Sequence, residues 1–177
     1  MKTEVENNSV ATNTSPWGRT GGAAIYKSLE EVMDPEIPTL SVIDMGMITG
    51  VEETATGVRV KMIPTFTACP AIHVIKDSIQ KKVESLGYEN VEVQLDDSIV
   101  WDSDRITPNG KILLENFGLG TPQRHCGNFG MEEIAHSKCP HCGSEDTTMN
   151  SIFGSTLCRS THFCFSCKQA FERFKPV

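Results

Sequence analysis

The sequence predicts an α+β protein built from two small domains, and three observations lead to this fold class. Residues 58–62 alternate apolar and charged side chains, which is typical of a half-buried strand. Residues 72–86 repeat apolar side chains every three or four positions, which is typical of an amphipathic helix. Two C-x-x-C motifs near the carboxyl end indicate a small metal-stabilised unit. A chain of 177 residues has room for one domain and a small second one.

The first domain is expected to follow the order helix, hairpin, helix, strand. One helical layer over a small mixed sheet would bury the single apolar face of each element. Gly46 lies inside an apolar run, which indicates a bend or a close approach between two backbone segments. The expected elements are a helix at 25–33, strands at 48–53 and 58–63 around a turn at 54–57, a helix at 72–86 and a strand at 90–95.

Composition divides the chain into four parts. The start is polar and rich in Asn, Ser and Thr, and a mixed stretch that contains glycine follows the first domain. The expected parts are a disordered tail at 1–20, the first domain at 21–124, a linker at 125–137 and a zinc ribbon at 138–177.

A lone cysteine, Cys69, follows the second expected strand and precedes the long helix. Pro70 is suited to a first helical turn, where its missing N–H is not needed, so Cys69 is expected at or beside the N-cap. Free backbone N–H groups and the helix dipole favour a thiolate there. The residues alone leave two interpretations open, a functional thiol and a small side chain packed in the core.

Four cysteines near the carboxyl end are predicted to bind a metal ion. Cys139 and Cys142 form one C-x-x-C turn, Cys164 and Cys167 form the other, and 21 residues separate the two turns. Two such turns offer four thiolates in the tetrahedral arrangement of structural zinc. A domain of about 40 residues buries too little apolar surface to fold alone, so the metal would stabilise it. Iron or an iron–sulfur cluster is the alternative occupant.

Four other side chains are auxiliary candidates. Cys158 stands beside Arg159, whose charge would favour a thiolate, although a packed and inert cysteine is the simpler interpretation. Asp34 and Glu36 would add negative charge near the corner cysteine, unless their loop is merely solvated. Thr67 offers a hydroxyl group two residues before that cysteine.

Composition also bears on the location and the partners of the chain. No apolar run approaches the roughly 20 residues of a membrane span, and the start lacks the features of a signal peptide, so a soluble cytoplasmic protein is expected. Residues 1–137 carry 11 basic and 20 acidic side chains, a balance of −9, whereas residues 138–177 carry 5 and 3, a balance of +2. Most of this surface would repel the phosphates of nucleic acid.

Several motifs resemble known families. Residues 34–38, 41–48 and 67–70 resemble the small iron–sulfur assembly family that includes the SufT proteins, over about residues 25–97. Further segments make the resemblance specific to one family within this group. They are Trp101-Asp102, the stretch 107–120, the two C-x-x-C turns and the segments 153–156 and 171–176. The chain beyond its tail is similar to the PaaD family, the D subunits of phenylacetyl-CoA epoxidase systems.

The resemblance implies a role in aerobic phenylacetate breakdown. The oxygenase of that system converts phenylacetyl-CoA to its ring 1,2-epoxide, using a di-iron subunit and a reductase with flavin and an iron–sulfur cluster. The PaaD family member is not the catalytic subunit, so the resemblance implies a non-enzymatic accessory protein that helps to assemble a metal centre in a partner. The oxygenase and reductase subunits are then the implied partners, and a homo-oligomer stays open.

The resemblance also implies roles for two cysteines. Cys69 matches the family's corner cysteine, and as a thiolate it would transiently hold iron or a cluster. Cys158 stands where the family also has a cysteine. Near His162 the family usually has an apolar residue, so His162 stays open as another metal donor.

Three alternative functions remain open for the chain. The first is a purely structural, zinc-containing subunit of the oxygenase complex. The second, less favoured, is a zinc ribbon that binds nucleic acid through the basic residues Arg159, Lys168, Arg173 and Lys175. A thiol oxidoreductase is a distant third.

Overall fold

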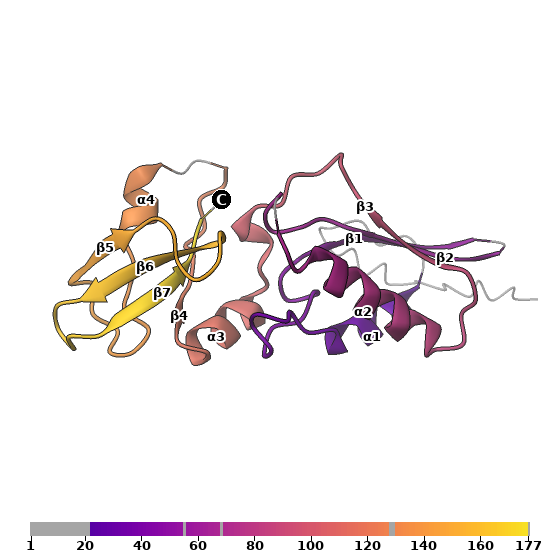
Figure 1. The fold of residues 1–177 in the computed structure, drawn as a ribbon, viewed down its shortest axis with the longest axis horizontal. Helices are drawn as coiled ribbons and strands as arrows, with labels where there is room; N and C mark the ends of the chain where they lie inside the picture. Colours follow the sequence, from indigo (N-terminus) through magenta and orange to yellow (C-terminus); the bar gives the residue numbers. More distant parts are fainter. Residues whose placement is uncertain (1–21, 55, 68, 128–129, 177) are drawn as a thin grey trace, which may run out of the picture.

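The computed structural model describes residues 22–54, 56–67, 69–127 and 130–176, and its elements gather around two sheets (Figure 1). The tail predicted at 1–20 lies outside the described residues. The elements of the first part are α1 (Ala23–Ser28), η1 (Leu29–Glu31), β1 (Ile48–Thr54), β2 (Gly57–Met62), α2 (Ile72–Glu84) and β3 (Val91–Leu95). Those of the second part are η2 (Ser103–Arg105), α3 (Pro108–Asn116), β4 (Leu119–Gly120), α4 (Met131–Ala135), β5 (Thr147–Ser151), β6 (Arg159–Cys164) and β7 (Ala170–Phe174).

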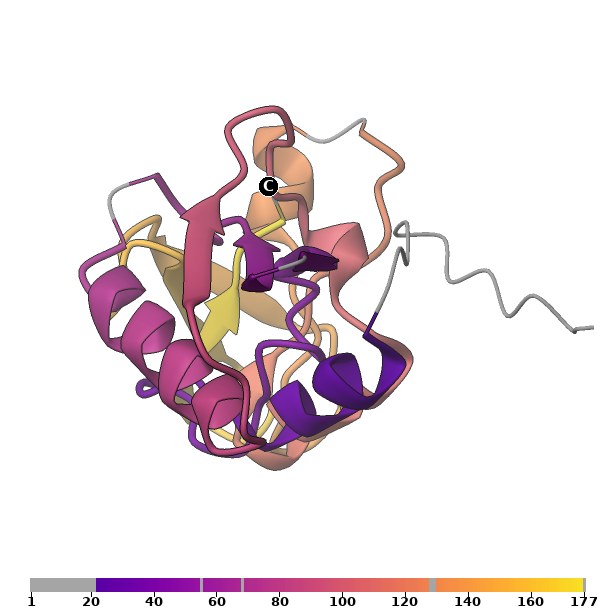
Figure 2. The same ribbon diagram turned by 90° about the vertical axis from the view of Figure 1, so that its right-hand side faces the viewer.

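The first sheet has the order β1-β2-β3. Together with the helices of the chain, the two sheets confirm the expected α+β fold class. β1 and β2 form the predicted antiparallel hairpin, while β3 pairs with β2 in parallel because α2 carries the chain back across the sheet. α1 and α2 cover one face (Figure 2). Val58, Val60 and Met62 are buried on that face, and Arg59 and Lys61 alternate with them on the other. The period-two pattern therefore placed these side chains correctly.

The helices differ from the expectation at their ends. The helix predicted at 25–33 is α-helical only to Ser28 and continues as a 3-10 turn to Glu31. The second helix begins at Ile72, with Ala71 as its N-cap, so Pro70 lies in the turn before it rather than in its first turn. No helix within the described residues is long and apolar enough to cross a membrane.

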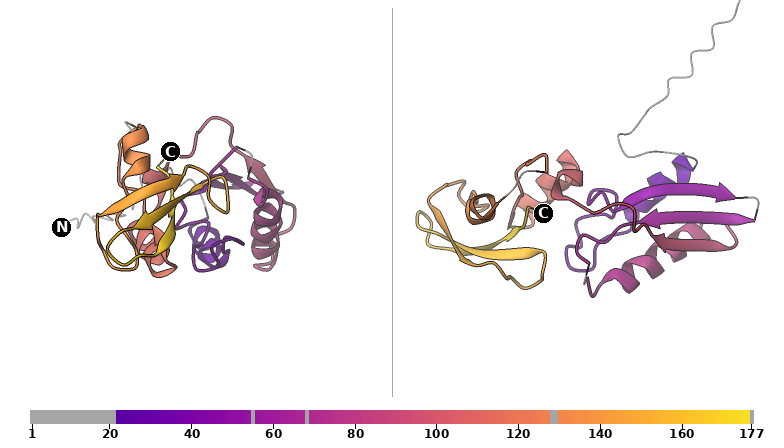
Figure 3. Two further views of the ribbon diagram at one scale, coloured as in Figure 1. Left: turned by 60° about the vertical axis from the view of Figure 1, so that its left-hand side comes forward. Right: turned by 90° about the horizontal axis from the view of Figure 1, so that it is seen from above.

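The second sheet has the order β4-β7-β6-β5; one C-x-x-C turn precedes β5 and the other joins β6 to β7. β5, β6 and β7 are antiparallel neighbours, and β4 adds to β7 in parallel. β4 belongs to the stretch expected in the first domain, and α4 lies within the expected linker. The division into domains at particular residues stays a prediction. Figures 1 and 3 show α3 where the chain passes from one sheet to the other.

The two halves share the main buried core, and the ribbon has a second, small cluster of its own. Phe174, at the end of β7, is 1% exposed and packs edge-on against Trp101 with 5.8 Å between ring centroids. The indole N–H of Trp101 donates to the carbonyl oxygen of Met45 at 2.8 Å. Both aromatic rings belong to the same cluster as the apolar side chains of the first sheet. The ribbon is therefore held against the first domain by apolar packing.

Gly46 lies where two backbone segments approach closely, which confirms the sequence prediction. Its φ is +64°, and a Cβ atom there would collide with the carbonyl oxygen of Arg105. The side chain of Arg105 in turn donates to the carbonyl oxygen of Gly46 at 2.9 Å. This contact fixes the 41–47 segment against the stretch that leads to the ribbon.

Replacing Gly46 by alanine is expected to lower the free energy of unfolding by at least about 2 kcal/mol, because left-handed strain and a backbone clash act together. Gly87→Ala is the matched control, since its φ is +91° but no atom lies within 4 Å of the added Cβ. The Gly87→Ala substitution should lower the free energy of unfolding by about 1 kcal/mol. Chemical denaturation measures both values, and equal losses would contradict the close approach at Gly46.

Candidate functional site

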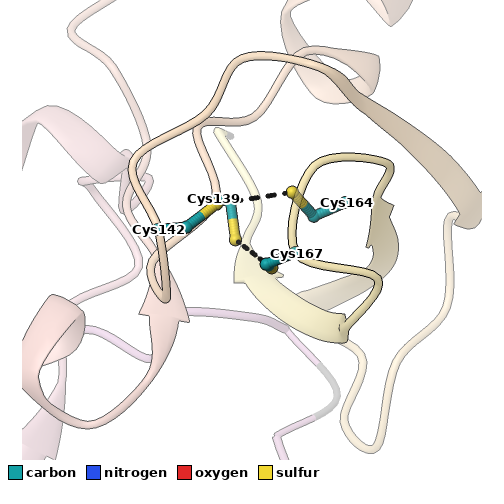
Figure 4. A group of neighbouring side chains, drawn as sticks. All are labelled: Cys139, Cys142, Cys164 and Cys167. Atoms are coloured by element: carbon teal, nitrogen blue, oxygen red, sulfur yellow. Dashed lines mark hydrogen bonds between the residues drawn. The ribbon is translucent and has the colours of Figure 1, made fainter.

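The four cysteines of the C-x-x-C turns converge on one point (Figure 4). Their sulfur atoms all lie within 4.8 Å of one another. Cys139 Sγ is 3.7 Å from Cys167 Sγ, and Cys142 Sγ is 3.6 Å from Cys164 Sγ. Thiolates bound tetrahedrally to zinc at about 2.3 Å are roughly 3.8 Å apart, so these spacings fit such an ion. The arrangement is a metal-binding cluster consistent with zinc.

The two turns that carry these thiols have matching backbones. In the first turn the N–H of Gly143 donates to the carbonyl oxygen of Cys139 at 2.9 Å, and in the second the N–H of Lys168 donates to that of Cys164 at 3.0 Å. Gly143 and Lys168 both have positive φ, at 74° and 60°. Backbone N–H groups of Cys167 and Ser166 lower the pKa of the Cys164 thiol to about 7. Each turn thus aims two sulfur atoms at the same point.

His162 is not part of this four-thiol group. Its Nε2 lies 2.9 Å from the hydroxyl oxygen of Ser160, and its ring stacks on Phe171. Burial, with the charge of Arg173, lowers the pKa of His162 to about 4. The ring is therefore a neutral component of the ribbon core.

The lone cysteine of the first domain lines a pocket that the two domains form together. Its volume is about 300 Å³. The first domain contributes the loop around Glu36 and the corner segment, and the ribbon contributes the loop between β5 and β6. The lining residues are Glu36, Thr65, Phe66, Cys69 and Pro70 from the first domain, and Phe153, Gly154, Ser155, Thr156, Leu157 and Cys158 from the ribbon. The corner cysteine and the auxiliary cysteine of the ribbon thus line one cavity.

The environment of Cys69 differs from the sequence prediction in one respect. The N–H groups of Ala71 and Ile72 do act on its sulfur and favour the thiolate, as a helix start should. Burial outweighs them, and the charges of Asp34 and Glu36 add to it, so the pKa of Cys69 lies above its usual value. The expected thiolate is therefore a protonated thiol at neutral pH while no metal is bound.

The pKa of Cys158 is set by the same kind of opposing effects. Burial raises its pKa, although the Thr156 hydroxyl and the charge of Arg159 oppose the effect. The Thr156 oxygen lies 3.0 Å from the sulfur. Glu36 acts on this thiol as well and raises its pKa further. One carboxylate thus influences both thiols of the pocket.

The other auxiliary candidates have different roles. The Asp34 carboxylate accepts the N–H groups of Glu36 and Ile37 at 2.8 and 3.0 Å, so it shapes the loop that presents Glu36. Thr67 is exposed and lines a neighbouring hollow with Asp96 and Trp101 instead. The structure therefore brings Glu36 to the thiols and leaves Thr67 aside.

Lys175 is the site residue that sequence reasoning missed. It is 6% exposed, and its Nζ lies 5.6 Å from the ring centroid of Phe66 and 5.5 Å from that of Phe153. Both rings belong to the pocket lining. The sequence alone suggests only a nucleic-acid contact for this lysine. Burial argues against that use, since Arg159 and Arg173 are also buried, at 7% and 2% exposure.

A second cluster of candidate ligands has a structural explanation. Oxygen or nitrogen atoms of Asp102, Asp104 and His125 lie within 4.8 Å of one another. The Asp104 carboxylate accepts the backbone N–H groups of His125 and Cys126, at 3.2 and 2.8 Å, and Asp102 accepts that of Asp104. These carboxylates anchor the start of the linker to η2.

Comparison with known proteins gives matches over both halves of the chain. Residues 22–95 match the family model described as iron-sulfur cluster assembly protein, and residues 124–175 match that of the PaaD zinc beta ribbon domain. A relative from Escherichia coli (strain K12), the D subunit of a 1,2-phenylacetyl-CoA epoxidase by its name, is 34% identical over 154 residues. The match covers 86% of this chain and 92% of the relative.

Solved structures resemble about half of the chain. A domain of unknown function from Bacillus anthracis has 23% identity and a TM-score of 0.48, covering 51% of this chain and 88% of its own. A conserved hypothetical protein from Thermotoga maritima has 27% identity and a TM-score of 0.40, covering 57% of this chain and 97% of its own.

The four-thiol cluster predicts one zinc ion per chain. Cys164→Ser should lose that ion and the folded state of the ribbon, because one turn can no longer close the tetrahedron. Elemental analysis together with thermal unfolding measures both effects. Cys126→Ser, which changes an exposed cysteine outside the cluster, should keep zinc and stability. Full zinc in the Cys164→Ser protein would contradict the assignment.

The charge of Glu36 leads to a prediction about the pH at which Cys69 reacts. Its negative charge raises the pKa of Cys69, so Glu36→Gln should lower that pKa and move alkylation of the thiol by iodoacetamide to lower pH. Peptide mass spectrometry across a pH series gives the midpoint for this cysteine alone. Glu30→Gln, on the exposed side of η1, should leave it unchanged. Identical midpoints for both variants would contradict the role of Glu36.

Proposed function

The chain belongs to the family of the 1,2-phenylacetyl-CoA epoxidase D subunits, and we propose that it delivers iron or an iron–sulfur cluster to a partner subunit of such a system. It is an accessory protein built from an assembly-type domain and a ribbon. The single observation that carries the proposal is the position of Cys69, which lines an interdomain pocket instead of packing in the core.

The chemistry of the pocket suits a transient metal cargo. Its ionisable lining consists of two thiols and one carboxylate, Cys69, Cys158 and Glu36. Thiolates select soft metal centres such as iron–sulfur clusters. Because burial raises the pKa of Cys69, metal must displace a proton to bind, which weakens the site and favours release. A site that delivers its cargo requires this weak binding.

The N–H groups of Ala71 and Ile72 stabilise the metal-bound state. They face the sulfur of Cys69 and favour its charged form. In the absence of metal they are outweighed by burial, and once a cation pairs with the thiolate the balance changes in their favour. The pocket thus keeps an idle thiol protonated and less open to oxidation.

The partner proposed to receive the cargo is the iron–sulfur reductase of the epoxidase system, with both proteins in the cytoplasm. The four-thiol cluster is proposed to hold structural zinc and to take no part in delivery, because four protein ligands close the coordination sphere. No step of the epoxidation itself is assigned to this chain.

The test is the cluster content of the reductase subunit after co-expression with this chain. Iron and acid-labile sulfide per reductase should be high with the wild type and with Cys126→Ser, and should fall several-fold with Cys69→Ser or without the chain. If Cys69→Ser supports full cluster content, delivery is refuted. If, in that case, the epoxidase complex loses subunits only when the whole chain is absent, the chain is a structural subunit of the complex.

A further inference from the structure

We infer that Cys158 is the second protein ligand of the metal held at Cys69, so that the ribbon completes the cargo site of the first domain. This inference rests on the proposed function and specifies its site. Cys69 and Cys158 are 89 positions apart in the chain, yet both line the same pocket of about 300 Å³. A pair of thiols in one cavity is a better soft-metal site than either alone.

The loop that carries Cys158 contacts the first domain through Arg159, whose guanidinium donates to the carbonyl oxygen of Glu36 at 3.3 Å. Within the ribbon, the backbone N–H of Lys175 donates to the carbonyl oxygen of Cys158 at 2.9 Å. Cys158 also packs against the shared core. Its position over the pocket therefore follows from interdomain contacts.

The same loop is tied to the ribbon sheet. The Glu172 carboxylate accepts the hydroxyl of Ser155 at 2.8 Å and pairs with Arg159 at 3.1 Å. Arg159 is buried and Glu172 is half-buried, so this ion pair is shielded from solvent. The sheet held together by the four-thiol cluster thus presents Cys158 in one place.

The charges around the two thiols suit a divalent cation. Glu36 lines the same pocket as Cys69 and Cys158, and its negative charge raises the pKa of both thiols. The ammonium group of Lys175, held between Phe66 and Phe153, interacts favourably with a charged Cys158. Two thiolates and a carboxylate balanced by a divalent ion and an ammonium group leave the site without net charge.

Binding is a simple exchange of protons for metal. Two S–H bonds break, two sulfur–iron bonds form to one Fe²⁺ ion, and two protons pass to solvent. The iron stays ferrous, so no oxidant or reductant is consumed. The coordination positions left by two thiolates are free for a ligand of the receiving protein.

The experiment titrates anaerobic, full-length, zinc-loaded protein with Co²⁺, whose thiolate charge-transfer absorption reports sulfur ligands. Elemental analysis verifies that zinc stays in the ribbon. Wild type and Cys126→Ser should bind one Co²⁺ with equal affinity. Cys69→Ser and Cys158→Ser should each halve the absorption per bound ion and weaken binding at least tenfold. If Cys158→Ser titrates like Cys126→Ser, the inference is wrong.

A second measurement needs no substitution. Phenylarsine oxide joins two neighbouring thiols and releases one water molecule, so the wild type should yield one arsenical that bridges the peptides of Cys69 and Cys158. Peptide mass spectrometry detects the bridge. Reaction of either cysteine without the other, at saturating reagent, would overturn the inference even if the serine variants fold poorly.

The two proposals fail in different ways. If Cys158→Ser leaves Co²⁺ binding unchanged while Cys69→Ser lowers the cluster content of the reductase, the two-thiol site is refuted and delivery stands. If both variants weaken Co²⁺ binding while the reductase keeps its full cluster content, the two-thiol site stands and delivery is refuted.

Discussion

The packing of Phe174 against Trp101 is the interaction on which the rest of the structure depends. It places the last residue of β7, a strand of the ribbon, inside the core of the first domain. Burial of such a ring contributes about 2–3 kcal/mol, more than the surface ion pairs of the first sheet. Because β7 pairs with β6, the position of Phe174 also sets the position of the loop before β6, which carries Cys158. The metal cluster, the docked strand and the interdomain pocket are consequently parts of one arrangement.

The properties of Cys69 illustrate how two opposing electrostatic effects are resolved. A helix start favours the thiolate through its backbone N–H groups, while burial and two carboxylates favour the thiol. Burial prevails in the metal-free protein. A thiol that becomes a ligand only when a cation arrives is suited to temporary binding, in contrast to the four thiols of the ribbon, whose arrangement would enclose an ion completely.

Much of the fold and part of the site could be predicted from the sequence, because those features depend on neighbouring residues. The hairpin follows from period-two alternation, the four-thiol cluster from two short motifs, and the close approach at Gly46 from its place in an apolar run. The N-cap of α2 was expected at or beside Cys69 but is Ala71, since Pro70 is compatible with the turn before a helix as well as with its first turn. The pocket that Cys69 and Cys158 both line could not be predicted in this way, because it depends on how two domains dock. The place of Lys175 beside the pocket could not be predicted for the same reason, since lysine is usually exposed, whereas this one is buried.

The most direct test of the account is a crystal structure of the protein loaded anaerobically with Fe²⁺, with anomalous scattering measured at the iron edge. An iron peak is expected in the interdomain pocket, bonded to the sulfur atoms of Cys69 and Cys158, with zinc among the four thiols of the ribbon. An iron peak bonded to neither sulfur atom of the pocket would contradict it.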